Sequence, residues 1–180
     1  MERLHNERTF ESKESASLYQ SAERLKEEYK NRSTKDLILA VGKFIKDHAH
    51  SLPEQHKVKN IIESRFMPAE EAFNKGVISC GSIVNMSAEM LRHIGFKVKL
   101  IHGECEEMVD HAWISVFDPT DETWVEYDLT RKDGNVPHTH KIKLEVHSWD
   151  EIKDQIIEDD RTFRERREER NLSKTQEKTP

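Results

Sequence analysis

The sequence predicts an α+β domain in which helices precede strands along the chain. Between about residues 37 and 94, apolar residues recur every three to four positions, which is the period of amphipathic helices. From Phe96 to Val146 they alternate with polar residues, which is the period of strands. Asp118-Pro119-Thr120-Asp121 favours a type I turn, so two of these strands form an antiparallel hairpin.

The composition fits one globular domain between two polar segments. The chain has 180 residues, of which 34% are hydrophobic and 36% charged, and the apolar residues concentrate between about Leu37 and Ile157. A chain of this length can bury a substantial core. We therefore expect a domain over residues 33–157, a polar N-terminal helical arm over 1–32 and a charged tail over 158–180.

The two polar segments have different patterns. In the arm, four apolar residues recur at helical spacing, so it forms a helix that either lies on the domain or is peripheral to it; they are Leu18, Ala22, Leu25 and Tyr29. The tail mixes charged and polar residues with few large apolar ones. It is expected to be disordered or to form a lone extended helix.

Charge and cysteine content exclude several classes of protein. The net charge is −6 and no sustained basic stripe occurs, which argues against nucleic-acid binding. The first residues do not resemble a secretory signal, and no apolar run reaches membrane-spanning length. With only Cys80 and Cys105 present, we expect a cytoplasmic protein with free thiols.

Four helices are expected between the N-terminal arm and residue 96. Ser33 to Asp36 resembles a capping box that opens a helix over 37–48, and Pro53 limits that helix. A second helix covers 58–66, and a third covers 68–73 with Pro68 at its first position. The fourth covers 80–94, with Ser79 as its N-cap and Gly95 in the left-handed position after its end.

Four strands and a closing helix follow. The first strand ends at His102-Gly103, and an acidic loop over 104–107 leaves Cys105 exposed. The hairpin strands cover 111–117 and 123–129, and a further strand covers 141–146. A final helix is expected over 149–157.

Cys80 occupies a position that favours a reactive thiol. It lies on the first turn of its helix, beside unpaired backbone N–H groups and the positive end of the helix dipole. This environment favours the thiolate, and the same N–H groups can receive the oxyanion formed at an attacked carbonyl. A lone cysteine is nevertheless more often a small buried residue. Cys105 lies among carboxylates that should raise its pKa, so it is the poorer nucleophile.

The hairpin offers a base and an orienting carboxylate for that thiol. If a four-residue loop covers 118–121, Phe117 faces Glu122 and His111 faces Asp128 across the ladder. A carboxylate at that separation can hold an imidazole N–H. Each residue alone also fits a structural role. Cys80, His111 and Asp128 together supply the nucleophile, base and orienting acid that thiol catalysis needs.

Other motifs give no cofactor. His138-Thr139-His140 and the pair His48 and His50 have chelating spacing but no nearby cysteine or third spaced ligand, so we expect no metal site. The six glycines are scattered and form no nucleotide-binding fingerprint.

Several ordered segments of the chain resemble the core of the transglutaminase-like superfamily. The resemblance covers roughly residues 35–147 and lies in five segments: Gly76-Val77-Ile78-Ser79-Cys80-Gly81, Met90-Leu91-Arg92-His93-Ile94-Gly95-Phe96, Ile101-His102-Gly103, His111-Ala112-Trp113-Ile114 and Trp124-Val125-Glu126-Tyr127-Asp128-Leu129-Thr130. It implies a papain-like α+β domain with N-terminal helices packed on an antiparallel sheet. It also implies that Cys80 is the nucleophile, His111 the base and Asp128 the orienting residue.

Some positions depart from or extend this pattern. Leu129 stands where the family usually has proline, Ser115 stands where an acidic residue is common, and the zinc-ligand cysteine pairs of the peptide-N-glycanase branch are absent. Papain-like enzymes place a side-chain oxyanion donor shortly before the cysteine, and Asn74 is the candidate here. Trp113 and Trp124 either wall the acyl site or, as is commoner for strand aromatics, belong to the core.

These features lead us to expect a cysteine-dependent acyl-transfer enzyme without a cofactor. Its substrate would be a peptide or protein amide, and its thioester intermediate would pass to water or to a second amine, with hydrolysis favoured. One alternative is a non-catalytic binding module that retains the fold. Another is an arylamine acetyltransferase-like acyl carrier, which we disfavour because the chain lacks the additional domain of such enzymes.

Overall fold

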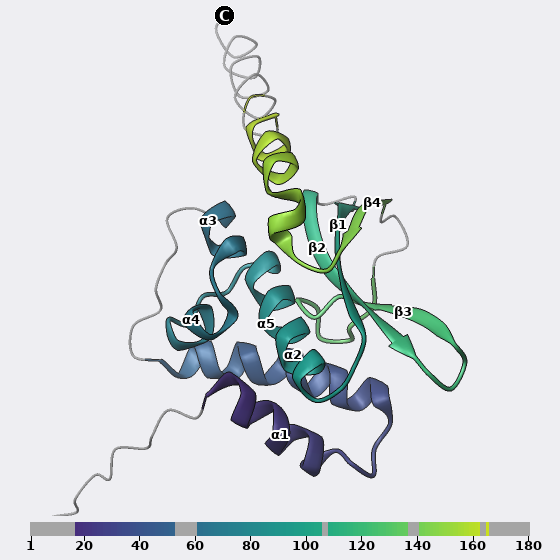
Figure 1. Cartoon of the computed structure of the whole chain (residues 1–180). Coiled ribbons are helices and arrows are strands. Elements are labelled where there is room, and N and C mark those ends of the chain that lie inside the picture. The colour runs from purple at the N-terminus through teal and green to yellow at the C-terminus, as the bar shows by residue number, and fades with distance from the viewer. Residues whose placement is uncertain (1–16, 53–60, 106–107, 137–140, 163–164, 166–180) are drawn as a thin grey trace, which may run out of the picture.

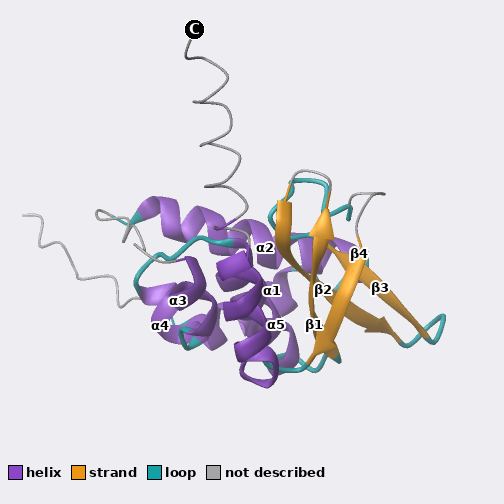
Figure 2. Ribbon diagram, turned by 90° about the horizontal axis from the view of Figure 1, so that it is seen from above, coloured by secondary structure: helices purple, strands orange, loops and turns teal. Residues whose placement is uncertain are grey.

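The structure consists of a layer of helices packed against an antiparallel sheet, as Figures 1 and 2 show. It is a computed structural model that describes residues 17–52, 61–105, 108–136, 141–162 and 165. The α+β class and the order of helices before strands, predicted from periodicity, are both confirmed.

In the described part of the chain five helices precede the sheet, and the sequence explains most of their boundaries. They are α1 (Leu18–Glu28), α2 (Thr34–Ser51), α3 (Ile61–Phe66), α4 (Ala69–Asn74) and α5 (Cys80–His93). Ser33 and Asp36 form the predicted capping box of α2. Gly95, with a φ of 104°, takes the left-handed conformation expected after α5. The predicted helix over 58–66 begins at a position among residues outside the described part of the chain, so α3 is given from Ile61.

Helix α1 lies on the domain rather than apart from it. Leu18 and Ala22 are fully buried, and Leu25 is nearly so. All three join the apolar cluster that α2 and α5 also form. Of the two alternatives for residues 1–32, the described part therefore supports the helix packed on the domain. The division of the chain at residue 32 itself stays a prediction.

The four strands found among the described residues form one antiparallel sheet in the order β3-β2-β1-β4. Their bounds are β1 (Val98–Cys105), β2 (Met108–Asp118), β3 (Thr123–Tyr127) and β4 (Lys141–Val146). The loop expected over 104–107 is wrong for Glu104 and Cys105, because β1 continues through both residues after a local irregularity near Gly103. The side chain of Cys105 lies outside the described set.

The register of the β2–β3 hairpin differs from the predicted one by two residues. Phe117 faces Trp124, and Asp118 faces Thr123, so the four-residue loop covers 119–122. The Asp118 carboxylate accepts a hydrogen bond from Thr120 N at 2.8 Å, which tightens the turn after Asp118 and leaves that residue in the ladder. Glu122, with a φ of 52°, completes the reversal. Because the displacement is even, every side chain keeps its predicted face of the sheet.

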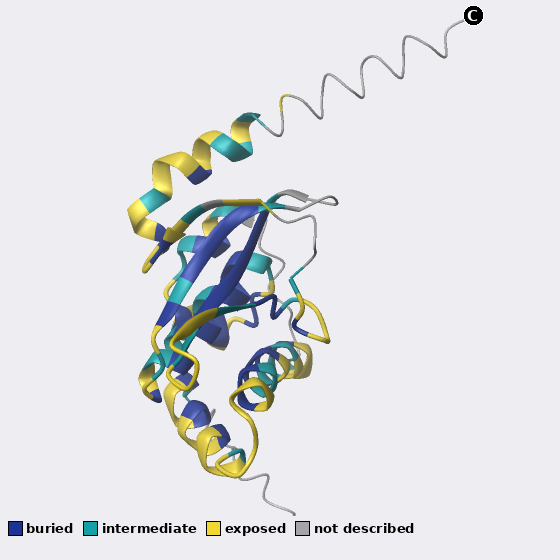
Figure 3. Ribbon diagram, turned by 90° about the vertical axis from the view of Figure 1, so that its right-hand side faces the viewer, coloured by how far each residue is buried: buried dark blue, intermediate teal, exposed yellow. Residues whose placement is uncertain are grey.

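The core lies between α5 and the central strands. Ala112, Ile114 and Val116 of β2 alternate toward the helices and meet Leu100 of β1 and the buried face of α5. Figure 3 shows the buried residues running along the two central strands, with exposed residues on the outer helices and loops. Helix α5 is thus held on both sides, which fixes the position of its first turn.

The chain after β4 returns to the helical layer. A short 3₁₀ helix (Trp149–Ile152) is followed by an α-helix over residues 153–162. The predicted closing helix is therefore present, and it continues past residue 157, where the charged tail was expected to begin. The rest of that predicted tail lies almost wholly outside the described residues.

Gly103 offers a test of the packing between β1 and its neighbours. A Cβ at this position would lie 2.4 Å from the Trp113 ring and 2.5 Å from the Lys141 carbonyl oxygen. We expect Gly103→Ala to destabilise the fold by about 1–3 kcal/mol through overpacking. Gly95→Ala is the matched control, because a Cβ there meets no atom and only the positive φ is unfavourable. Urea unfolding measures both, and equal losses for the two variants would contradict the packing explanation.

Candidate active site

Cys80 lies at the first turn of α5, which a cluster of serines fixes. Ser79 Oγ accepts from Ser82 N at 3.1 Å, and Ser82 Oγ accepts from Ser79 N at 2.7 Å, forming a capping box. Ser64 of α3 lies 2.8 Å from Ser79 Oγ, so α3 packs against the same turn. Cys80 itself is half-buried. The predicted placement of the thiol at a capped helix N-terminus is confirmed.

His111 and Asp128 form a buried pair, although by a different geometry from the predicted one. His111 Nε2 donates to Asp128 Oδ2 at 2.9 Å, and each side chain is only 1% exposed. Extending the observed ladder beyond Tyr127 sets Asp128 opposite Trp113. His111 is therefore the diagonal neighbour of Asp128 on the same face, which is within reach of these side chains. The predicted directly opposed pairing is wrong, and the predicted contact is present.

The chain after β3 holds the Asp128 carboxylate in place. Asp128 Oδ1 accepts from Thr130 N at 3.0 Å and from Thr130 Oγ1 at 2.6 Å. Asp128 N donates to Gly134 O at 2.9 Å. The two carboxylate oxygens are thus divided between the loop and the imidazole, which leaves His111 one orientation.

This arrangement makes the thiol acidic and the imidazole basic. Burial alone would lower the pKa of His111, but its hydrogen bond to Asp128 and the neighbouring Cys80 thiol raise that pKa to about 10. Burial would raise the pKa of Cys80, but His111 and the Arg65 guanidinium lower it below its ordinary value. Among the described residues His111 Nδ1 has no hydrogen-bond partner, and it is the nitrogen left for Cys80 once Nε2 binds Asp128. At neutral pH these directions favour a thiolate beside an imidazolium.

Arg65 and Asp110 also lie beside the thiol, and sequence reasoning missed both. Arg65 Nη2 lies 3.7 Å from Cys80 Sγ and 3.0 Å from Asp110 Oδ1. The chain has 29 Lys and Arg residues, and apolar periodicity does not distinguish Arg65 from the others. The available signal was Gly81, since a glycine inside the first turn of a helix indicates close approach by another group.

The other candidate residues lie elsewhere. Asn74 is exposed at the end of α4, and no described hydrogen bond joins it to Cys80, His111 or Asp128. Trp113 is fully buried and donates from Nε1 to Glu126 at 2.8 Å, in keeping with the core alternative. Trp124 is 39% exposed and lies near the start of β3, away from Asp128. Lys99 Nζ lies 4.3 Å from the centroid of its ring. The roles suggested for Asn74 and Trp124 stay predictions.

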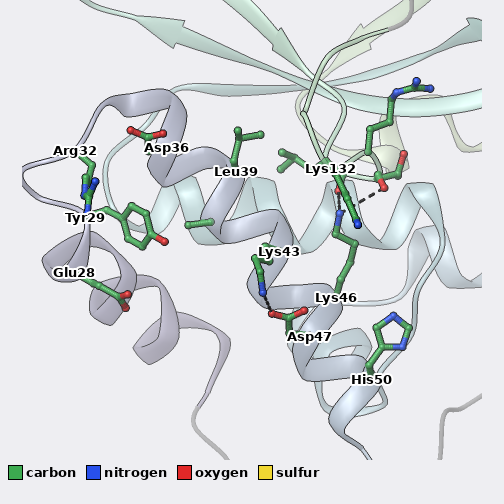
Figure 4. Close-up of a pocket in the computed structure, with 14 residues that line it drawn as sticks. Glu28, Tyr29, Arg32, Asp36, Leu39, Lys43, Lys46, Asp47, His50 and Lys132 are labelled. Carbon is green, nitrogen blue, oxygen red and sulfur yellow. Dashed lines mark hydrogen bonds and ion pairs between the residues drawn. The ribbon is translucent and has the colours of Figure 1, made fainter.

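A separate pocket of about 980 Å³ lies between α1, α2 and the segment after Asp128 (Figure 4). Its lining mixes basic, acidic and apolar side chains and does not include Cys80, His111 or Asp128. At its inner edge Lys46 Nζ donates to Leu129 O at 2.8 Å, which ties α2 to the chain just after Asp128. The pocket thus borders the segment that holds Asp128 rather than the Cys80 thiol.

Among the described residues, no group of three or more His, Cys, Asp or Glu side chains is arranged to hold a metal ion. His138 and His140, which have chelating spacing, lie outside those residues. In the same part of the chain, no helix has both the length and the apolar character needed to cross a membrane.

The pairing of His111 with Asp128 predicts that replacing the carboxylate with a neutral amide changes the pKa of His111. Asp128→Asn retains an oxygen for Thr130 but removes the charge, so we expect the pKa of His111 to fall by about 1–3 units. A raised pKa in the folded state means that this pair stabilises the protein below pH 6.5 and that the stabilisation declines as the pH rises toward 10. NMR titration of the imidazole measures the pKa. Asp118→Asn, in the hairpin turn, is the control and should leave His111 unchanged, whereas an unchanged pKa in Asp128→Asn would contradict the assignment.

Comparison with known proteins identifies the family of the chain. The model of the transglutaminase-like superfamily matches residues 18–129, which is more than half of the chain and includes α1, α5 and the hairpin. No curated protein and no solved structure matches the chain significantly. The resemblance inferred from the sequence is confirmed: the chain belongs to the transglutaminase-like superfamily.

Proposed function

We propose that the protein is a cysteine-dependent amide hydrolase in which Cys80, His111 and Asp128 act as a catalytic triad. The observation that carries the proposal is the buried 2.9 Å contact between His111 Nε2 and Asp128, which leaves Nδ1 for the thiol at the start of α5. Membership of a superfamily that typically performs cysteine-dependent acyl transfer supports the same reaction class.

In the first half-reaction the Cys80 thiolate attacks the carbonyl carbon of an amide. The C=O π electrons move to oxygen, and a tetrahedral intermediate forms. Reformation of the carbonyl breaks the C–N bond, and the imidazolium of His111 gives its proton to the departing nitrogen. The products are a free amine and a thioester on Cys80. Asp128 orients the ring and stabilises its charged form throughout.

In the second half-reaction His111 takes a proton from water, and the resulting hydroxide adds to the thioester carbon. Collapse of this second intermediate breaks the C–S bond, releases a carboxylic acid and returns the thiolate–imidazolium pair. An amine that takes the place of water would give transamidation by the same steps. The oxyanion of both intermediates lies near the first backbone N–H groups of α5, which have no acceptor within their own helix.

A non-catalytic binding module is the alternative from another class. A module needs no carboxylate–imidazole pair buried beside a thiol, and burying such charges costs free energy unless they are paired. The buried pair therefore favours the enzyme. The arylamine acetyltransferase-like alternative has no specific support among the observed contacts.

Release of amine from a set of glutamine-containing peptides and fluorogenic peptide amides tests the proposal, with hydroxylamine added as an alternative acceptor. We expect kcat/KM to fall by at least about 10³-fold in Cys80→Ala and about 10²–10⁴-fold in His111→Ala and Asp128→Asn. Intact mass should show an acyl adduct on the wild type.

Cys105→Ala is the matched control and should retain full activity, since Cys105 lies at the end of β1 and outside the triad. Equal turnover in Cys80→Ala and the wild type would exclude Cys80 as the nucleophile. Absence of turnover, together with a Cys80 thiol that reacts no faster than Cys105 with iodoacetamide near pH 6, would instead identify a binding module.

A further inference from the structure

Arg65 is buried in a position that is unusual for a guanidinium. Its exposure is 1%, and its charged group lies between α3, the first turn of α5 and the sheet. The Trp149 ring lies 5.2 Å from its Cζ atom, on the side of the 3₁₀ helix. A buried charge of this kind persists only when several partners satisfy it.

Gly81 makes the close approach of Arg65 to Cys80 possible. A Cβ on Gly81 would lie 2.6 Å from Arg65 Nε and 2.7 Å from its Cγ, which no side chain tolerates without movement. Trp149 Nε1 donates to Gly81 O at 3.3 Å and closes the same side of the turn. The residue after the cysteine is therefore small so that the guanidinium can lie across the helix start.

A chain of polar contacts anchors Arg65 from behind. Asp110 Oδ1 accepts from Arg65 Nη2 at 3.0 Å and lies 3.2 Å from His102 Nδ1. His102 is fully buried, and its Nε2 donates to Asp159 at 3.0 Å. Burial would raise the pKa of Asp110, but the bond to His102 and the charge of Arg65 keep that pKa low. This Arg65 cluster, consisting of Arg65, Asp110, His102 and Asp159, joins α3, β2, β1 and the C-terminal helix beside the thiol.

We propose that Arg65 is a second, pH-independent cation for the Cys80 thiolate, held there by the Arg65 cluster and admitted by Gly81. The proposal rests on the proposed function in that Cys80 is the nucleophile. Because a guanidinium stays protonated throughout the working pH range, it stabilises the thiolate before the attack on the amide, whatever the protonation state of His111. The same charge keeps Cys80 a good leaving group when the thioester is hydrolysed.

The charged and titratable groups around Cys80 come from every described element that packs there. Arg65 comes from α3, and Asp110 and His111 come from β2. Asp128 acts on Cys80 through His111. His102 of β1 and Asp159 of the C-terminal helix act through Asp110. Two cations thus flank the thiol, and a carboxylate beside it, Asp110, partly offsets them.

The pH dependence of iodoacetamide alkylation at Cys80, read by peptide mass in the full-length chain, tests the proposal. Arg65→Met removes the charge and keeps much of the apolar stem, so we expect alkylation at pH 6 to slow by about tenfold or more, as the thiol pKa rises by about one unit. Arg65→Lys keeps a cation and should recover most of the rate. In a His111→Ala background, Arg65→Met should slow alkylation again by a similar factor.

Asp110→Asn distinguishes an electrostatic role of Arg65 from a structural one. It also provides a test if circular dichroism shows that Arg65→Met does not fold. It removes the carboxylate beside the thiol while its Oδ1 still accepts from Arg65. We therefore expect alkylation at pH 6 to be faster than in the wild type, the opposite direction from Arg65→Met. A slower rate in Asp110→Asn, with native circular dichroism, would overturn the proposal.

Two further results distinguish failure of this inference from failure of the proposed function. If Arg65→Met folds and leaves the pH profile unchanged while His111→Ala shifts it upward, the role of Arg65 is refuted and the triad stands. If the wild-type profile of Cys80 already has its midpoint near the ordinary value of about 8.5, both are refuted. Peptide-amide turnover, measured in parallel, should follow the alkylation rates of the Arg65 variants.

Discussion

The buried contact between His111 and Asp128 is the constraint on which the arrangement of the site depends. It joins the central strand β2 to the segment that leaves β3, and both side chains are almost completely removed from water. A carboxylate in such a position is costly unless each oxygen has a partner. Thr130 and His111 supply those partners. The segment after β3 must therefore adopt one conformation, and the contact of Lys46 with Leu129 O secures it from α2.

The thiol lies where the two layers of the fold meet. Its helix comes from the N-terminal layer, whereas His111 and Asp110 come from the sheet. Burial of α5 against β2 brings these groups together. The apolar core therefore positions the thiol, the imidazole and the carboxylate. Two buried polar clusters then face the same sulfur atom, one through His111 and one through Arg65. Each is hydrogen-bonded along its length, which is the condition under which such networks specify a single arrangement.

The roles proposed for the two cations, His111 and Arg65, differ because their side chains differ in chemistry. His111 can hold and release a proton, so in the proposed mechanism it serves the leaving group and the incoming water. Arg65 does not release one in the working pH range, so the contribution proposed for it is a constant positive charge beside the sulfur. The carboxylates follow the same logic. Asp128 accepts a hydrogen bond from the His111 ring, and Asp110 accepts one from the Arg65 guanidinium.

Much of the fold and of the candidate site could be predicted from the sequence, because these features depend on local periodicity and on residue chemistry. The change from helical to strand period predicted the α+β class, and Ser79, Gly95 and the apolar spacing between them predicted α5. The alternation of side chains in the hairpin predicted that His111 and Asp128 lie on one face of the sheet. The predicted register was wrong by two residues, but an even shift leaves each side chain on the same face. Only the packed structure decided which residues of the hairpin pair, since an Asx turn at Asp118 moved the loop by one position. Only the packed structure brought Arg65 to Cys80, because the two lie on separate helices whose approach is set by the space over Gly81 and by burial against Trp149.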